Sequence, residues 1–343
     1  AMTWSSGQKL HGNNYILEKE LKRGQFSVTY LASDRKKTQW VVKTLSDQLI
    51  HDFNQPEVDQ LQETFLCEAV KLVKCRHPHL VQVKEPLVEG HQVGIVMEYL
   101  DGVDLASHAQ KGLPESEALL YVQQIGEALK VLHEAGLIHR DVKPSNIRLR
   151  TDKQEAVLID FGLARGCEDA STTVDTHTAD GFDALELYNV ETPLGAYTDV
   201  YSLAATLYFL VTGEIPPKAM DRCMSKARLI PPKQINEQIS DRTNEVILIG
   251  MALQVDERPQ TIQEWLDLLG LQRQITGSGR QKSPMILIGA IIAVVGVLGL
   301  IAAWFLFKPT AIPQQPTPVQ TPVSSLIHTP VNSVYPITFW SNV

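Results

Sequence analysis

The feature that most constrains this chain is an uninterrupted apolar run of 23 residues, Met285 to Phe307, which contains no charged side chain. About 20 such residues are enough to cross the hydrocarbon core of a bilayer as a helix. A buried helix of a large soluble domain is the alternative interpretation, but such helices rarely continue this far without a charge. The run therefore predicts a single transmembrane helix at 285–307 and divides the chain into two unequal parts.

The charges beside this run predict its orientation. Arg273, Arg280 and Lys282 precede it, whereas Lys308 is the only charged residue after it. Because Lys and Arg are enriched on the cytoplasmic side of a span, we expect the long N-terminal part in the cytoplasm and residues 308–343 outside the cell membrane. This tail has seven prolines, five threonines and no acidic residue, which is typical of an extended stalk. The stretch before the span, 271–284, is expected to be a juxtamembrane linker.

The composition argues against nucleic acid as a partner and against zinc sites and disulfides. The chain carries 39 acidic and 31 basic residues, a formal net charge of −8. This balance gives no broad positive field for a phosphate backbone, so nucleic acid is not expected as a partner. The four cysteines form no C-x-x-C pair, which predicts neither a zinc site nor a disulfide framework.

The part before the apolar run changes in character near residue 99. Residues 15–98 contain short β-rich runs and one helical stretch, 57–74, whereas residues 99–270 carry apolar residues mainly at helical spacing. This pattern predicts an α+β fold in which a small sheet-rich lobe precedes a larger helical lobe. Residues 1–14 are expected to be an N-terminal extension.

The residues best suited to chemistry lie early in the helical part. The stretch H-R-D-V-K-P-S-N contains Asp141, Lys143 and Asn146, and a D-F-G sequence that begins at Asp160 follows it. Phosphoryl transfer needs a group that orients a hydroxyl nucleophile, a cation for the transferring phosphate and oxygen ligands for Mg²⁺. These four side chains offer all three.

The two motifs, in this order and 19 residues apart, resemble the signature of the bacterial eukaryotic-like (Hanks-type) serine/threonine protein kinases. The resemblance covers roughly residues 15–270. It implies a bilobal protein kinase fold, with an N-lobe at 15–98 and a C-lobe at 99–270. It does not reach the single transmembrane helix, which the apolar run alone predicts to follow this fold.

The resemblance also implies roles for the four side chains. Asp141 would be the catalytic base that orients the hydroxyl, and Lys143 would stabilise the transferred phosphoryl group. Asn146 and Asp160 would hold Mg²⁺, with Mn²⁺ as an alternative. The phosphate donor would be ATP.

An ion pair in the smaller lobe is implied as well. Lys43, on an expected strand, matches the lysine that holds the α and β phosphates. Glu68 stands nine residues before His77, at the spacing of the glutamate that holds this lysine in place, and Glu63 is the weaker candidate.

Four further positions are implied to contact the nucleotide. Gly24 and Val28 fall in the loop that covers the phosphates. Glu98 and Leu100 fall in M-E-Y-L, which resembles the hinge whose backbone bonds to adenine.

Three departures from the family pattern leave alternatives open. Lys22 and Ser27 replace two of the three glycines of the phosphate-covering loop, which stiffens it, although Lys22 offers an extra charge contact. Arg148 stands where an apolar residue usually lies under adenine, so its guanidinium stacks on the base, points away, or weakens nucleotide binding as a desolvated charge in the pocket. Ala179 replaces a threonine that bonds to the catalytic residues, with Thr178 as a neighbouring substitute.

Structural and regulatory residues complete the resemblance. Glu186 and Arg258 would form a structural ion pair, and Asp199 would brace the catalytic loop. Arg140 would receive a phosphate on the segment between the D-F-G sequence and Glu186, which predicts activation by autophosphorylation. The candidate phosphoacceptors are Ser171, Thr172, Thr173, Thr176 and Thr178.

The sequence thus predicts a membrane-anchored, ATP-dependent kinase that transfers the γ-phosphate to serine or threonine hydroxyls of protein substrates. Glycines in the span, Gly289, Gly296 and Gly299, are compatible with a homodimer. The alternative hypothesis is a membrane-anchored pseudokinase that acts as a binding scaffold. The departures favour the scaffold, whereas the intact transfer groups favour the enzyme.

Overall fold

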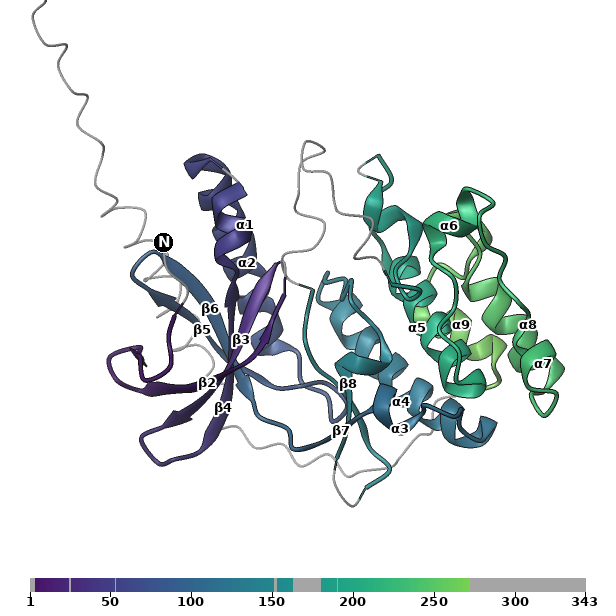
Figure 1. The fold of residues 1–343 in the computed structure, drawn as a ribbon, viewed down its shortest axis with the longest axis horizontal. Helices are drawn as coiled ribbons and strands as arrows, with labels where there is room; N and C mark the ends of the chain where they lie inside the picture. The colour runs from purple at the N-terminus through teal and green to yellow at the C-terminus, as the bar shows by residue number, and fades with distance from the viewer. Residues whose placement is uncertain are drawn as a thin grey trace, which may run out of the picture. The chain divides into compact units, whose positions relative to one another are not determined.

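The computed structural model describes residues 4–24, 26–52, 54–150, 153–162, 180–189 and 191–271, which belong to one compact unit. A six-stranded antiparallel sheet in the order β1-β2-β3-β4-β6-β5 comes first, and mostly helical structure follows it (Figure 1). The strands are β1 (Lys9–Leu10), β2 (Tyr15–Arg23), β3 (Ser27–Asp34), β4 (Gln39–Leu45), β5 (Val83–Glu89) and β6 (Gln92–Glu98).

The core of the sheet lobe lies on one face of this sheet. Val28, Tyr30 and Ala32 alternate along β3 and are all buried, because successive side chains of a strand point to opposite faces. They belong to a cluster that also contains Trp4 and Leu10.

Helices α1 (Asp47–Asp52) and α2 (Gln55–Lys74) follow β4 and lie beside the sheet (Figure 1). The start of α2 is fixed by a capping box, in which Asn54 and Glu57 exchange side-chain to backbone hydrogen bonds. Its apolar face is buried, and α2 packs against β5. The predicted ion-pair residue Glu68 is therefore carried on a well-anchored helix.

The helical lobe is built around α5 (Ala196–Thr212), which is buried from Thr198 to Val211. Around it pack α4 (Glu115–Glu134), α8 (Asp241–Gly250) and α9 (Ile262–Leu268). The shorter helices are α3 (Leu105–His108), α6 (Ala219–Cys223) and α7 (Pro232–Ile235), and the 3-10 turns are η1 (Pro144–Asn146), η2 (Leu185–Tyr188) and η3 (Val255–Glu257).

A second, three-stranded sheet positions the motif residues. It consists of β7 (Gly102–Asp104), β8 (Ile147–Arg150) and β9 (Ala156–Leu158), in that order. The segment between α2 and β5 is tied to β9, because the Val81 N–H donates to the Leu158 carbonyl over 2.9 Å. Asn146 thus stands just before β8 and Asp160 just after β9.

The described residues match the bilobal fold that the sequence predicts, with a difference at the N-terminus. Trp4 lies in the core cluster, and β1 pairs with β2, so the sheet lobe begins before the predicted boundary at Tyr15. The sequence does not predict that residues before Tyr15 pack on the sheet lobe, because one tryptophan and a two-residue strand form no periodic pattern.

The predicted linker after residue 271, the transmembrane helix at 285–307 and the tail at 308–343 lie outside the described residues. Within the described ranges, none of the helices combines the length and the apolar character that a membrane span requires.

Candidate active site

An open cleft lies between the first sheet and the loops next to β8 and β9. Its walls combine apolar side chains, suited to an aromatic base, with charged and amide groups. The lining residues are Leu21, Lys22, Thr29, Val41, Val81, Met97, Glu98, Tyr99, Leu100, Ser145, Asn146, Arg148, Ile159 and Asp160.

Asp199, at the start of α5, is hydrogen-bonded to the backbone of the loop that carries Asp141. The Asp199 carboxylate accepts hydrogen bonds from the backbone N–H groups of His139 over 2.8 Å and Arg140 over 3.0 Å, and it contacts His133 Nε2 at 2.7 Å. Burial alone would raise the pKa of Asp199, but the bond to His133 and these donors hold it below its ordinary value. A buried carboxylate thus fixes the loop, as the sequence suggested.

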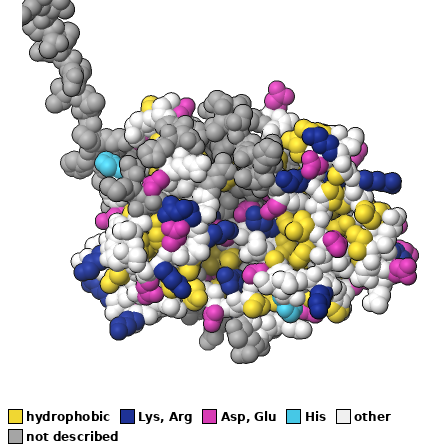
Figure 2. Space-filling model, in the orientation of Figure 1, with side chains coloured by type: hydrophobic (Ala, Val, Ile, Leu, Met, Phe, Trp, Pro, Cys, Tyr) yellow, Lys and Arg dark blue, Asp and Glu magenta, His cyan; other side chains and the backbone are white. Residues whose placement is uncertain are grey.

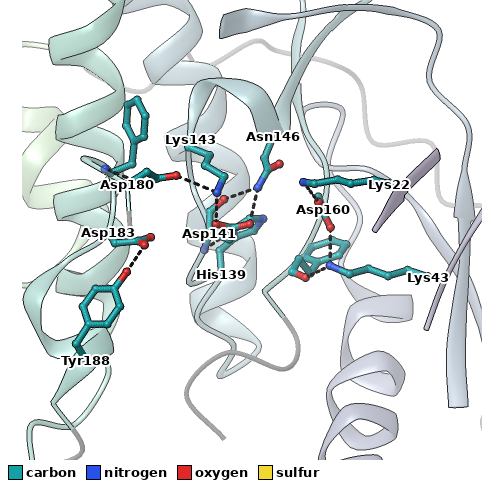
Figure 3. Close-up of polar contacts among 12 residues, drawn as sticks. Lys22, Lys43, His139, Asp141, Lys143, Asn146, Asp160, Asp180, Asp183 and Tyr188 are labelled. Carbon is teal, nitrogen blue, oxygen red and sulfur yellow. Dashed lines mark hydrogen bonds and ion pairs between the residues drawn. The ribbon is translucent and has the colours of Figure 1, made fainter. Parts of the chain in front are cut away.

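Three of the four predicted transfer groups, Asp141, Lys143 and Asn146, meet within hydrogen-bonding distance (Figure 3). Asn146 Nδ2 donates to Asp141 Oδ2 over 2.7 Å, and Lys143 Nζ lies 3.0 Å from Asp141 Oδ1. Lys143 also donates to Asp180 Oδ2 over 3.1 Å. Burial alone would lower the pKa of Lys143, but the two carboxylates raise it, so this side chain is a cation at neutral pH.

Asp180 is a residue whose position beside Lys143 was not predicted. Its Oδ1 accepts a hydrogen bond from the Phe182 N–H over 3.1 Å, while Oδ2 faces the lysine. The sequence could have indicated this contact, because Asp180 directly follows Ala179, the position at which the family pattern has a threonine that bonds to the catalytic residues. Both Ala179 and the alternative Thr178 lie outside the described residues.

The Asp160 carboxylate accepts hydrogen bonds from two lysines, one on each oxygen (Figure 3). Lys43 Nζ lies 2.5 Å from Oδ1, and Lys22 Nζ lies 3.0 Å from Oδ2. Burial alone would raise the pKa of Asp160, but these two cations depress it well below its ordinary value. The backbone of Asp160 is left-handed, with φ of 63°, a conformation that aspartate tolerates better than most residues.

The predicted pair between Lys43 and Glu68 is not formed in this structure. Glu68 Oε1 accepts a hydrogen bond from Arg140 instead, and its buried Oε2 has no hydrogen-bond partner among the described residues. Lys43 is already occupied, since its ammonium also donates to the Phe161 carbonyl over 2.5 Å. The weaker candidate Glu63, also on α2, is exposed.

The predicted nucleotide contacts divide into two groups. Glu98 and Leu100 line the cleft, whereas Val28 is fully buried in the core of the sheet lobe. Strand alternation explains this correction, because the next residue, Thr29, is the one that faces the cleft. Gly24 lies at the end of the β2–β3 hairpin, where its N–H donates to Ser27, and it is not among the lining residues.

Arg148 lines the cleft, and its guanidinium is anchored at the edge. Arg148 Nη1 donates to the Gly102 carbonyl over 2.5 Å. This bond holds the guanidinium at the backbone of Gly102, and the effect of Arg148 on a bound base stays a prediction.

The remaining predicted pair is structural, as expected. Arg258 binds Glu186 with two hydrogen bonds, of 2.7 and 2.9 Å, and both side chains are buried. Bidentate pairs of this kind fix geometry strongly. The candidate phosphoacceptors, from Ser171 to Thr178, lie outside the described residues.

The donor set fits a magnesium ion delivered with a nucleotide. Asp160 and Asn146 both face the cleft and offer a carboxylate and an amide oxygen. Within the described ranges, no three His, Cys, Asp or Glu side chains are grouped closely enough to hold a metal ion by themselves. Mg²⁺ usually binds one or two protein ligands together with substrate phosphates, and Asp160 and Asn146 would be those two ligands.

Comparison with known proteins agrees with this geometry. The family model described as the protein kinase domain matches residues 15–267. A probable serine/threonine-protein kinase of Clostridium perfringens is 32% identical over 268 residues, which is 75% of this chain and 38% of the relative. Serine/threonine-protein kinase PknB of Mycobacterium leprae is 34% identical over 269 residues, 74% of this chain and 42% of PknB. The chain thus spans about two fifths of the length of these curated relatives.

Among solved structures, the PknI kinase domain of Mycobacterium tuberculosis superposes with a TM-score of 0.60 at 23% identity, covering 78% of this chain and 99% of that domain. At this identity the likeness concerns the fold alone. The match of the family model, the two-lobed fold and the cluster of Asp141, Lys143, Asn146 and Asp160 lead to one conclusion: this chain belongs to the protein kinase domain family.

Proposed function

We propose that the protein is an ATP-dependent kinase that transfers the γ-phosphate of ATP to serine or threonine hydroxyls of other proteins. The observation that carries this proposal is that Asn146 and Asp160 line the cleft, and that Asn146 binds Asp141, which in turn pairs with Lys143. Relatives named as serine/threonine kinases support the choice of acceptor.

In the proposed reaction, the hydroxyl oxygen forms a bond to the γ-phosphorus as the bond to the departing ADP oxygen breaks. Asp141 orients the hydroxyl and accepts its proton, while Asn146 holds that carboxylate in place from its other side. The Lys143 ammonium stabilises the negative charge of the transferred group. Mg²⁺, bound with the nucleotide at Asp160 and Asn146, would neutralise phosphate charge.

The test is incorporation of labelled phosphate from ATP and Mg²⁺ into the chain itself and into a generic basic protein. Wild-type protein should incorporate label, and Asp141→Asn should reduce the rate by at least about a hundredfold. Asp241→Asn is a matched control, because that carboxylate is exposed and distant in sequence from the site. Equal incorporation by wild type and Asp141→Asn would contradict the proposal.

A pseudokinase scaffold is the second candidate, and two observations favour it. Glu68 binds Arg140 rather than Lys43, and both oxygens of Asp160 are taken by lysines. If all forms fold but none incorporates label, the scaffold becomes the better proposal.

We also propose that autophosphorylation regulates kinase activity through Arg140. Arg140 is held by Glu68, and a phosphate on one of the candidates between Ser171 and Thr178 would compete for its guanidinium. Mass spectrometry of active protein should find a phosphate in this stretch, and an unmodified stretch in fully active protein would contradict the idea.

Membrane anchoring through 285–307, with the kinase domain cytoplasmic and the tail outside, belongs to the same proposal and rests on the 23-residue apolar run. The chain expressed in a bacterial host should sediment with membranes, and deletion of 285–307 should release it. Recovery of the undeleted chain in the soluble fraction would contradict the anchor. If the chain forms the proposed homodimer, chemical crosslinking in the membrane should yield a species of twice the monomer mass, and monomer alone would contradict the dimer.

A further inference from the structure

Lys22 is an unusual residue for its place in the cleft. It stands where the family pattern has the first glycine of the phosphate-covering loop, near the end of β2. A bulge between Glu20 and Lys22 interrupts the pairing of β2 with β3, and Lys22 lies opposite Thr29, which also lines the cleft. Its side chain therefore projects toward the site rather than along the outer surface (Figure 3).

The two lysines on Asp160 differ in how firmly they are held. The Lys43 side chain is 6% exposed and binds both Asp160 and the Phe161 carbonyl, whereas the Lys22 side chain is 56% exposed. Partly exposed ion pairs contribute little to stability and exchange partners easily. Lys22 is thus the cation on Asp160 that an incoming ligand would displace.

The local charge indicates which ligand this would be. Two ammonium groups share the one carboxylate of Asp160, so Lys22 can leave it for an anionic ligand while Lys43 still neutralises that carboxylate. Lys22 is a single point charge with three donors on a flexible stem, which suits it to phosphate oxygens. Neighbouring Arg23 is different, because it binds Glu20 on the same strand.

We propose that Lys22 is a second nucleotide-binding lysine, which holds Asp160 while the cleft is empty and moves to the triphosphate when the nucleotide enters. This proposal rests on the proposed function, because it requires that the cleft bind ATP. It makes two predictions. Lys22 contributes to the binding of ATP without metal, and it competes with Mg²⁺ for Asp160.

The experiment measures binding of ATP and adenosine to the purified 343-residue chain by calorimetry, in EDTA and over a series of Mg²⁺ concentrations. Lys22→Met removes the charge and keeps the stem, Lys22→Arg restores a charge, and Arg23→Met is the matched control. Lys22→Met should weaken metal-free binding of ATP by about two- to fivefold, the contribution of one partly exposed charge contact. Binding of adenosine should stay unchanged, and Lys22→Arg and Arg23→Met should behave like wild type.

The Mg²⁺ series gives the second readout. Lys22→Met should reach half of its Mg²⁺-dependent gain in ATP affinity at a lower Mg²⁺ concentration than wild type, because Asp160 is no longer shared. Unchanged metal-free binding of ATP by Lys22→Met, or an equal loss of adenosine affinity, would overturn the inference alone. Failure of wild-type protein to bind ATP with or without Mg²⁺ would overturn both the proposed function and the inference.

Discussion

At the residue scale, Lys143 lies between two carboxylates of different origin. Asp141 belongs to the catalytic loop, and Asp180 belongs to the segment that leads to Glu186. Asp180→Asn should lower the rate of phosphate transfer about tenfold while leaving the KM for ATP unchanged, because it loosens the position of Lys143 without touching the base-binding part of the cleft. Steady-state kinetics with Asp241→Asn as control checks this split, and a wild-type rate would contradict a positioning role for Asp180.

A second residue-scale prediction concerns stability alone. Glu186→Gln leaves the buried guanidinium of Arg258 without its carboxylate. Removing one partner of a buried ion pair commonly costs about 3 kcal/mol or more, because the remaining charge stays desolvated. Urea unfolding should show this loss as a lower midpoint. A free energy of unfolding within about 0.5 kcal/mol of wild type would mean that the backbone carbonyls around Arg258 replace the carboxylate.

At the element scale, the segment before β2 acts as part of the sheet lobe. Trp4 is only 4% exposed, and its backbone carbonyl accepts a hydrogen bond from Tyr30 Oη over 2.7 Å. Trp4→Ala should lower the free energy of unfolding by about 3 kcal/mol, as for other large buried aromatic residues. Ile16→Ala, at a 40% exposed position on β2, should change it by less than about 0.5 kcal/mol. Equal effects of the two substitutions in thermal or urea unfolding would show that Trp4 is not a core residue in solution.

At the scale of the whole molecule, the buried His139 and the half-buried His77 and His79 link stability to pH. Burial lowers the pKa of His77, His79 and His139 below the ordinary value of 6.5, so the unfolded chain binds more protons than the folded chain as the pH falls. The free energy of unfolding should therefore decrease as the pH falls below about 6.5. Depressed carboxyl pKa values, such as that of Asp199, act in the same direction only at more acidic pH.

Urea unfolding at pH values between 7 and 5 measures this dependence. The double substitution His77→Gln and His79→Gln should make it shallower, since these two groups lie outside the cleft and their titration would be removed. A dependence as steep as that of wild type would assign it to other groups.

Much of this protein follows from local sequence. The α+β character and the order of the lobes come from apolar periodicity, which depends only on neighbouring residues. Asp141, Lys143, Asn146 and Asp160 could be named in advance because short motifs of fixed spacing carry them, and Asp199 and Arg258 likewise. The pairing of Glu186 with Arg258 was also predictable, since both residues stand in such motifs.

What the tertiary structure decided is which of these groups touch. Strand alternation in β3 placed Thr29 rather than Val28 at the cleft, and a bulge in β2 turned Lys22 toward Asp160. Glu68 pairs with Arg140, whereas Lys43 binds Asp160 and the Phe161 carbonyl. Charged side chains compete for partners that are distant in sequence, and only their positions in space determine the outcome. Acidic and basic side chains are also interspersed on the face shown in Figure 2, so the same competition for partners applies at the surface.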